Sequence, residues 1–458
     1  MHVDVEGRAR RDMAIDVVAA DTVVAPSAPV SDVAHTLLRL GRLMLLSGAA
    51  TEHVQEALTT LARRLGYQPH LLIFAEGLLL TLQNQHEFHT KVGPPISGMS
   101  VNMTALSALD GIVRQGLIAT SDIAQIERQL DAIEHDRNGY PGWLVALGLG
   151  LAAASLARLF GGGPTVVAVT ALVGILSAEL RERLEALSIN PIAGAATLAF
   201  VTGTAGGLAL NAFPDTSPVA CLVAAGTVLI PAVPLINGMR DTLGRHVGAG
   251  ISHLALGIII VLSIAFGLLL AASVTGAMLS VGSTLPRPSL GDEILFSALA
   301  GMGFAVVFNV PLRAAWGCMV CAAVGHGLRT VLLQTDVSLV IGSLAGAFAV
   351  ALLARVFARR FRIPAVAFTF PGVVTLLPTP EAFRAALGAL DIVHAGAAAS
   401  LSLIAATIAL AVTAILVIAS IAIGLSLAFA APFAVVVPYT VKVRASRDHA
   451  SPADIDAV

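Results

Sequence analysis

The stretch that decides the fold is residues 224–244, AAGTVLIPAVPLINGMRDTLG, in which Pro231 and Pro234 break an apolar run that passes at once into a polar turn. A degenerate copy, PGVVTLLP, occupies residues 371–378. Proline-broken membrane segments at corresponding places in two halves of a chain are the best sequence-level pointer to a transporter's binding site. The pattern therefore predicts a membrane transporter with its site at the two breaks.

The composition agrees with a membrane protein. Hydrophobic residues make up 56% of the 458-residue chain and charged residues only 12%, about half the charge of an ordinary soluble domain. The formal net charge of −2 argues against nucleic-acid binding by the chain as a whole. The three cysteines, Cys221, Cys318 and Cys321, lie in apolar segments and favour neither a disulfide framework nor a zinc site. We interpret the last two as small residues in a packed helix, in preference to a redox pair.

The first 140 residues are expected to lie outside the membrane. Residues 1–30 have no unbroken apolar core of the kind a signal peptide needs and predict a disordered tail. Residues 31–140 predict a cytosolic α+β domain, with helices that begin near Ser31 and Thr51. Residues 68–92 lack the helical period and predict two or three short strands. Two further helices complete the predicted domain.

Ten apolar segments follow, and most approach the length of about 20 residues that spans a bilayer. They are 142–160, 164–180, 191–210, 217–236, 251–272, 294–310, 314–332, 337–356, 364–378 and 396–430. The ninth is short, and the last is long enough to raise an eleventh crossing, which we interpret as an interfacial tail. With ten crossings, most arginines and lysines fall on one side, including those of the tail 441–458, and few, such as Arg329, fall in outer loops. The positive-inside rule then places both termini in the cytoplasm.

The ten segments divide into two similar halves, 141–275 and 290–440. Pro231 lies 140 residues before Pro371, and other matches follow in order at similar offsets. Because each half holds five crossings, the second half enters the membrane from the opposite side. The sequence thus predicts an inverted 5+5 repeat, a site near the midplane and an alternating-access mechanism.

Two runs carry a resemblance to a known family: GRLMLLSGAATEHV at residues 41–54 and LIPAVPLINGMRD at residues 229–241. They resemble the bacterial threonine/serine exporter family, over nearly the whole chain from about residue 31. The resemblance implies a cytosolic domain joined to ten helices of the bacterial inner membrane, and export of small hydrophilic amino acids with the proton gradient. Related two-subunit members are associated with dicarboxylate export, which stands as the alternative. The second half departs from the family pattern at Leu377–Pro380, where a second Pro-Gly pair is expected.

Candidate solute-binding residues follow from the breaks, because a broken helix frees backbone groups whose dipoles can bind a carboxylate or an ammonium. Asn237 and Thr227 could add side-chain hydrogen bonds. The candidate substrate-binding set is Thr227, Pro231, Pro234, Asn237, Asn309, Thr369 and Pro378. Asn309 has an alternative interpretation as a helix cap, and Thr369 as a residue that satisfies carbonyls of its own helix.

Two ionisable residues are candidates for proton coupling. Asp241 could attract the ammonium of a solute or take a proton. The alternative interpretation is that Asp241 lies in an exposed loop and pairs with Arg240 or Arg245. His326 lies deep in an apolar segment, where an ionisable group is a functional candidate by default. Its alternative is a histidine close enough to the outer surface to be solvated.

Two other classes of function, an enzyme and a passive channel, are alternatives to a transporter. An enzyme anchored to the membrane, a hydrolase, could use His86, Glu87 and His89, or a triad of Ser47, His53 and Asp110, but neither spacing matches a specific motif. A passive channel would need rings of like charge or a repeated filter motif, and none is visible. We expect no enzyme activity, cofactor or metal. The expected partners are a small solute, protons and the lipid bilayer, and the sequence is compatible with a homo-oligomer.

Overall fold

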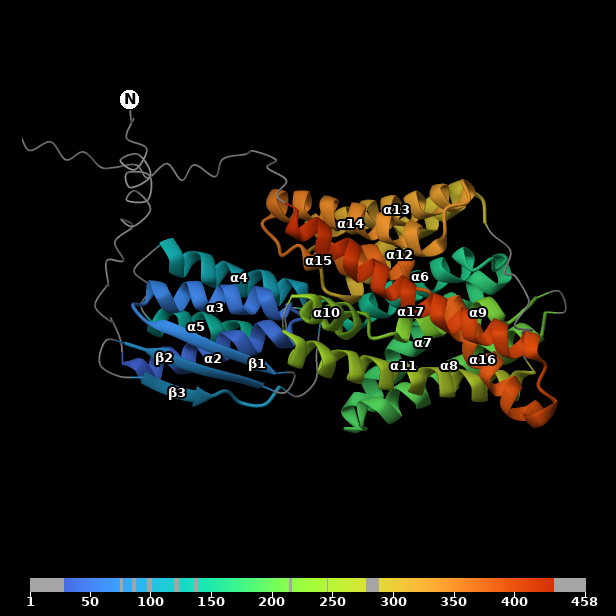
Figure 1. Ribbon diagram of the computed structural model, residues 1–458, viewed down its shortest axis with the longest axis horizontal. Helices are drawn as coiled ribbons and strands as arrows, with labels where there is room; N and C mark the ends of the chain where they lie inside the picture. The colour runs from blue at the N-terminus through green and yellow to red at the C-terminus, as the bar shows by residue number, and fades with distance from the viewer. Residues whose placement is uncertain are drawn as a thin grey trace, which may run out of the picture.

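The protein is mostly helical in the computed structural model, which describes residues 29–74, 77–84, 88–96, 101–118, 123–135, 139–213, 216–244, 246–276 and 288–431. Of the expected tail 1–30, only residues 29 and 30 fall within these ranges, and the expected tail 441–458 lies wholly outside them. An N-terminal part of mixed helix and strand packs at one end of a bundle of apolar helices (Figure 1). We call residues 30–135 the N-terminal part and residues 142–430 the bundle.

The N-terminal part is a three-stranded antiparallel sheet with helices on one face. Its elements are α2 (Val30–Leu46), α3 (Thr51–Arg64), β1 (Gln68–Phe74), β2 (Gly77–Gln83), β3 (Phe88–Val92), α4 (Met103–Ile118) and α5 (Ile123–His135). The strand order is β1-β2-β3. Alternate residues of the central strand, Leu78, Leu80 and Leu82, are buried against the helices, as a period of two requires. The sequence predicted two or three strands here, and the structure has three.

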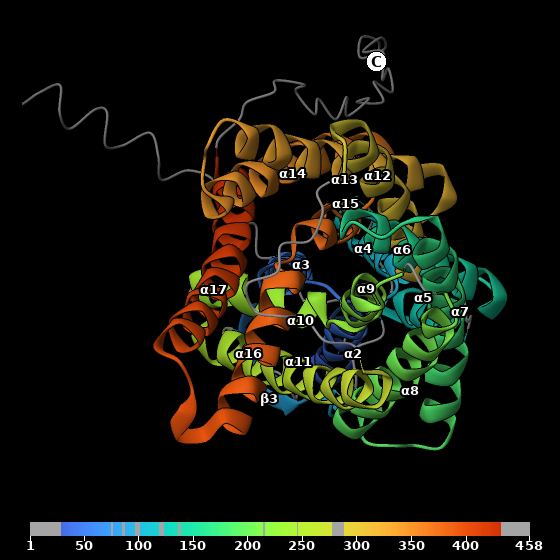
Figure 2. The same ribbon diagram turned by 90° about the vertical axis from the view of Figure 1, so that its right-hand side faces the viewer.

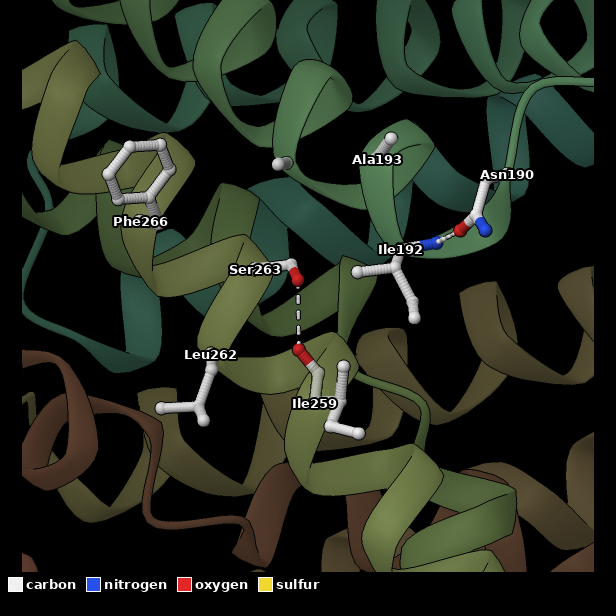
Figure 3. A pocket seen from close by; sticks show the side chains of 8 residues that line it. Asn190, Ile192, Ala193, Ile259, Leu262, Ser263 and Phe266 are labelled. Carbon is white, nitrogen blue, oxygen red and sulfur yellow. Dashed lines mark hydrogen bonds between the residues drawn. The ribbon is translucent and has the colours of Figure 1, made fainter.

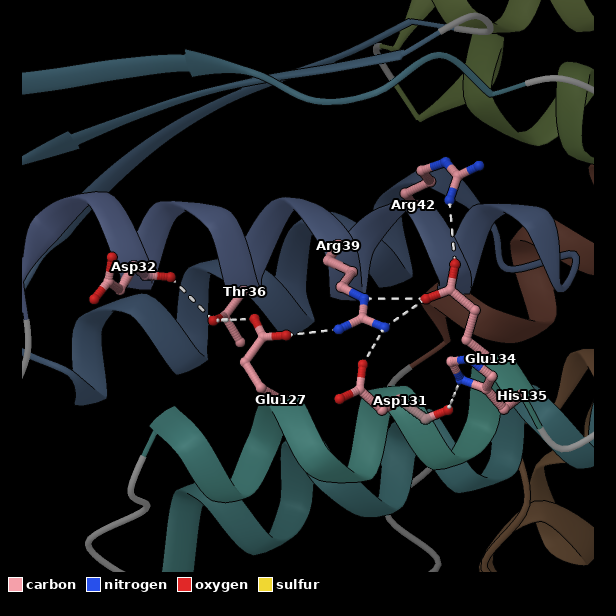
Figure 4. Close-up of polar contacts among 8 residues, drawn as sticks. All are labelled: Asp32, Thr36, Arg39, Arg42, Glu127, Asp131, Glu134 and His135. Carbon is pink, nitrogen blue, oxygen red and sulfur yellow. Dashed lines mark hydrogen bonds and ion pairs between the residues drawn. The ribbon is translucent and has the colours of Figure 1, made fainter.

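Arg39 ties the first helix of this part to the last. Its guanidinium nitrogens lie 2.7 Å from Glu127, 2.6 Å from Asp131 and 2.5 Å from Glu134, all on α5 (Figure 4). The three acids recur every three or four residues, so they share one face of α5. Because Arg39 is only partly exposed and bonds three partners, this network fixes α5 against α2 more firmly than one surface ion pair would.

The bundle contains the apolar helices. Their bounds are α6 (Gly142–Leu159), α7 (Pro164–Ala186), α8 (Pro191–Asn211), α9 (Val219–Leu229), α10 (Ala232–Leu243), α11 (Val247–Thr275), α12 (Leu290–Val307), α13 (Leu312–Gln334), α14 (Leu339–Phe361), α15 (Val366–Val373), α16 (Thr379–Ala395) and α17 (Leu401–Ala430), with short 3-10 turns η1 (Val374–Leu376) and η2 (Gly396–Ala398). Among the described residues, eight helices are long and apolar enough to cross a membrane, and α9 with α10 forms a bent pair that could be a ninth span. The chain is therefore a multi-pass membrane protein.

Both proline-rich stretches interrupt helices, as the sequence predicted. The axes of α9 and α10 differ by 58° across the break at Ile230 and Pro231. In the second half, α15 tightens into η1 and ends at Leu377, whose backbone is extended, before α16 begins. The segment Val366–Leu376 is too short to span a bilayer alone, in agreement with the short ninth segment of the sequence.

The broken helices lie in the interior of the bundle. Figure 2 shows α9, α10, α15 and the start of α16 inside a ring made by the long helices α6, α7, α8, α11, α17, α14, α13 and α12, with α16 running outward between α11 and α17. All residues of α9 and α15 are buried, which agrees with that view. The ring places both breaks where neighbouring helices, and not lipid, must satisfy the freed backbone groups.

The two halves of the bundle meet along α6 and α12 at very small residues. A Cβ atom at Gly303 would lie 2.5 Å from the carbonyl oxygen of Gly148, and one at Gly148 would lie 2.9 Å from the Val306 side chain. Real Cβ atoms do not approach that closely, so both positions need glycine. Small residues at such a contact let two helix backbones pack directly in a membrane.

Candidate functional site

The first break follows from the hydrogen-bond chemistry of proline. In a continuous helix the amide of residue 231 would donate to the carbonyl of Thr227, but Pro231 has no amide hydrogen. The amide of Ile230 donates to Thr227 O instead, at 3.2 Å, and the amide of Ala232 to Ile230 O, at 2.8 Å. Pro234 lies in the first turn of α10, where an amide has no intrahelical acceptor and proline costs little.

The second half of this broken helix, α10, meets the N-terminal part through Asn237 and Asp241. These residues are four apart and share one face. Asn237 Nδ2 donates to the carbonyl oxygen of Gly48 at 3.5 Å, and Thr51 Oγ1 donates to Asp241 Oδ2 at 2.8 Å. Gly48 ends α2 with φ +95°, in the left-handed region that favours glycine. We call residues 47–51 the α2–α3 turn.

Asp241 has a second partner in the bundle. His253 Nδ1, on α11, lies 3.2 Å from the same carboxylate oxygen. An ionised carboxylate only accepts hydrogen bonds, so this contact needs a proton on Nδ1 whenever Asp241 is ionised. Asp241, His253 and Thr51 are all at least nine-tenths buried. The interpretation of Asp241 as an exposed loop partner of Arg240 is therefore wrong: Arg240 instead lies over the Phe429 ring of α17, 4.7 Å from its centroid, and Arg245 falls outside the described residues.

At the second break the freed carbonyls have side-chain partners. Pro380 lacks the amide that would serve Leu376 O, and Arg329 Nη1 donates to that oxygen at 3.0 Å. Arg329 Nη2 donates to Thr375 O at 3.2 Å, and His326 Nδ1 lies 3.0 Å from the same carbonyl. The assignment of Arg329 to an outer loop is thus corrected, because its guanidinium satisfies the interior break.

His326 also pairs with an acid that the sequence analysis did not select. Its Nε2 lies 3.3 Å from Glu293 Oε2 on α12, and Thr330 Oγ1 donates to the same carboxylate. His326 is buried, so its interpretation as a solvated surface histidine is wrong. Glu293, Arg329 and His253 were missed as site residues, although an ionisable residue in an apolar segment is a signal that could have found them.

The remaining candidates lie apart from these contacts. Asn309 has φ +52°, and its Oδ1 accepts from the amide of Tyr140 at 2.7 Å while its carbonyl accepts from Thr104 Oγ1 at 2.6 Å. It therefore docks the N-terminal part onto the α12–α13 loop. The Thr227 hydroxyl donates to Val223 O at 2.7 Å, and the Thr369 hydroxyl reaches carbonyls of its own helix.

The groups considered for a hydrolase do not form a triad. His53 Nε2 lies 2.7 Å from Asp110 Oδ1, but no hydrogen bond joins Ser47 Oγ to either within the described structure. Burial disfavours the charged imidazole of His53, yet the hydrogen bond to Asp110 and its charge outweigh burial, so the pKa of His53 is raised above 6.5. His86 and Glu87 lie outside the described residues. No cluster of three potential His, Cys, Asp or Glu metal ligands occurs in the part of the chain that the structure describes.

A surface hollow of about 650 Å³ lies away from both breaks, between α8 and α11 (Figure 3). Its lining includes Ile192, Leu262 and Phe266, and the last two are exposed. Its two polar side chains are occupied: Ser263 Oγ donates to Ile259 O, and Asn190 caps α8. An open, apolar hollow on the outer face of a membrane bundle suits lipid chains better than a hydrophilic solute.

Two family models match the chain, and together they cover most of it. The ThrE model, a threonine/serine exporter model, matches residues 35–275, and a second threonine/serine exporter model, ThrE_2, matches residues 293–431. The chain belongs to the threonine/serine exporter family. Members of this family are transporters and not enzymes, so the hydrolase interpretation is rejected.

The curated relatives match about half of this chain. A probable succinate transporter subunit, YjjP, of Klebsiella aerogenes is 28% identical over 236 residues, which are 51% of this chain and 90% of the relative. The YjjP protein of Escherichia coli K12 is 26% identical over 247 residues, 53% of this chain and 95% of the relative. An uncharacterised Haemophilus influenzae protein is 30% identical over 122 residues, 27% of this chain and 41% of that protein. No solved structure matches.

Proposed function

We propose that this protein is a secondary active exporter of threonine and serine that works by alternating access in the bacterial inner membrane. The observation that carries the proposal is the pair of helices that break inside the bundle, at Pro231 and before Pro378. Interior breaks of this kind expose backbone dipoles near the middle of the membrane, where transporters hold small polar solutes. Both termini are proposed to lie in the cytoplasm.

The helix order supports an inverted repeat. In each half the fourth crossing is broken: α9 with α10 in the first, and α15 with η1 and α16 in the second. The third and fifth helices pack together in both halves, α8 on α11 and α14 on α17. If α15 and α16 together count as one crossing, the bundle has ten, five in each half, and the second half is inverted.

Proton coupling is proposed at two buried acid–imidazole pairs, one beside each break. Asp241 pairs with His253 near the first, and Glu293 pairs with His326 near the second. Carboxylates and imidazoles inside a membrane bundle are characteristic of proton relays.

The N-terminal part is proposed to close the inner end of the path and to do no chemistry. Its α2–α3 turn contacts the very face of α10 that carries Asn237 and Asp241. In this structure those side chains are buried beneath the turn and cannot meet a solute from that side. Opening toward the cytoplasm therefore requires the turn to withdraw from α10.

A dicarboxylate is the second candidate solute, because two relatives carry names as succinate transporter subunits. Transport of labelled threonine, serine and succinate into inverted vesicles, with and without a pH gradient, separates the two. Accumulation of threonine or serine that collapses with the gradient supports the amino-acid proposal. Gradient-driven accumulation of succinate alone replaces it with the alternative, and accumulation of none refutes both.

A further inference from the structure

Three polar groups around the second break are buried and have no hydrogen-bond partner: Thr375 Oγ1, Thr379 Oγ1 and Arg329 Nε. Both threonines are more than nine-tenths buried, with 3% and 7% of their surface exposed. Buried polar groups in native proteins are nearly always bonded, and one without a partner calls for an absent water, ion or ligand. Thr375 and Thr379 flank the break, and Arg329 is bonded to the carbonyls between them, so the three groups mark a position that a ligand would complete.

The three groups are held together by the break itself. Thr375 is in η1, and Thr379 is the first residue of α16. The two terminal nitrogens of Arg329 are already bonded to the carbonyls of Leu376 and Thr375. The guanidinium is therefore anchored on the peptide units between the two threonines, and its Nε–H is left as an unused donor.

The start of α16, whose first residue is Thr379, adds backbone donors. The first amides of a helix have no intrahelical acceptor. Pro378 and Pro380 have no amide hydrogen, and the amide of Ala382 donates to Pro378 O at 3.0 Å. The amides of Thr379 and Glu381 remain, at the positive end of the helix dipole.

We propose that Thr375, Thr379, Arg329 Nε and the first amides of α16 form the subsite for a carboxylate of the transported solute. This inference rests on the proposed function. Amide and guanidinium N–H groups only donate and hydroxyls can donate, whereas an ionised carboxylate only accepts, so the two sets are complementary. Hydrogen bonds to a charged acceptor are about twice as strong as neutral ones. A threonine or serine zwitterion and a dicarboxylate both supply this group.

The charged groups near this subsite favour an amino-acid zwitterion over a dicarboxylate. The negative charges of Glu293 and Glu381 both attract the Arg329 guanidinium. Glu381 lies in the first turn of α16. One guanidinium with two acidic neighbours, of which Glu293 also pairs with His326, offers no excess positive charge to a dianion. A solute that brings its own ammonium offsets these acids while its carboxylate occupies the donors.

Equilibrium binding to the purified full-length chain in nanodiscs tests the subsite. The probes are labelled threonine, serine and succinate, with threoninamide, which lacks the carboxylate, as a competitor. The test variant is Thr375→Val with Thr379→Val, which keeps shape and removes both hydroxyls. Two controls are Thr375→Ser with Thr379→Ser, which keeps the hydroxyls, and Thr204→Val, which removes another buried, unpartnered hydroxyl from α8.

The valine pair is expected to lose about a hundred-fold or more in affinity, since each hydrogen bond to a charged group contributes about 1.5–3 kcal/mol and about 1.4 kcal/mol is tenfold. The serine pair and Thr204→Val should stay within about twofold of the wild type, and threoninamide should compete weakly. Should the valine pair not fold, each single valine variant is expected to lose about tenfold or more. Unchanged affinity in folded valine variants, or strong competition by threoninamide, overturns the subsite alone. A wild-type protein that binds none of the probes overturns the proposed function as well.

Discussion

Thr51 Oγ1 donates a hydrogen bond to Asp241 Oδ2 at 2.8 Å and so joins residues that are 190 positions apart in the sequence. Both residues are almost completely buried. The bond crosses from the first turn of α3 to α10, the second half of a broken helix. A charged acceptor buried at a contact between two parts of a protein makes their docking sensitive to the charge of one carboxylate.

Thr51→Val is expected to weaken this docking. Loss of a hydrogen bond to a buried charged group costs about 1.5–3 kcal/mol, and the helix start itself is not capped by this side chain. Hydrogen exchange of the α2–α3 turn in the full-length protein should become faster. Thr60→Val, which removes a hydroxyl bonded only to its own helix, is the control. Equal exchange in the two variants would show that the bond does not hold the turn.

Asn237→Ala and Asp241→Asn test the proposed path at the first break. Asn237→Ala should reduce export, with the loss of hydrogen bonds that contribute roughly 1 kcal/mol each. Asp241→Asn should go further and flatten the dependence of export on external pH, because an amide cannot carry the proton. Transport into vesicles at several pH values, at matched protein abundance, measures both. A wild-type pH response in both variants would move the site elsewhere.

Arg329→Met should destabilise the bundle strongly. It removes the donors to Leu376 O and Thr375 O and leaves Glu293 without one of its cationic neighbours. Removing one partner of a buried charged network typically costs about 3–5 kcal/mol. Thermal unfolding in detergent is the measurement. Arg329→Lys should recover only part of the loss, because a single ammonium cannot reproduce the planar fork. Full recovery by lysine would mean that charge alone matters.

The pair of His53 and Asp110 predicts a pH dependence of stability in the N-terminal part. The folded pKa of His53 is raised, so the folded state binds its proton more tightly than the unfolded state does. The resulting stabilisation is fully present below the unfolded pKa of about 6.5 and is lost as pH rises through the folded pKa. The difference in unfolding midpoint between the wild type and His53→Gln should therefore shrink as pH rises. A difference that grows with pH would contradict the assignment.

The sequence predicted the parts of the site that depend on local chemistry. Pro231 and Pro378 interrupt helices because proline lacks an amide hydrogen, and that follows from residue type alone. The partners of Asp241 did not follow. Thr51 and His253 reach it from segments whose own patterns show only helix starts and apolar faces, so neither contact has a local signature.

The contacts at the second break were also only partly predictable from the sequence. His326 stood out because it is a histidine in an apolar run, but Arg329 was assigned to a loop by counting charges. Only the packing of α13 against the second break gives its guanidinium two carbonyls to bond. Side-chain direction within the last turns of a helix depends on neighbours that a linear pattern does not contain.

The docking of the α2–α3 turn onto α10 takes place within one polypeptide. Because the turn is tethered to α10 by the chain, its effective concentration there can reach millimolar. An association with a dissociation constant below that concentration keeps the turn bound most of the time. Dissociation of the turn is then a unimolecular step, independent of how much protein the membrane holds. Its rate would set an upper limit on how often the inner end can open, whatever the supply of solute.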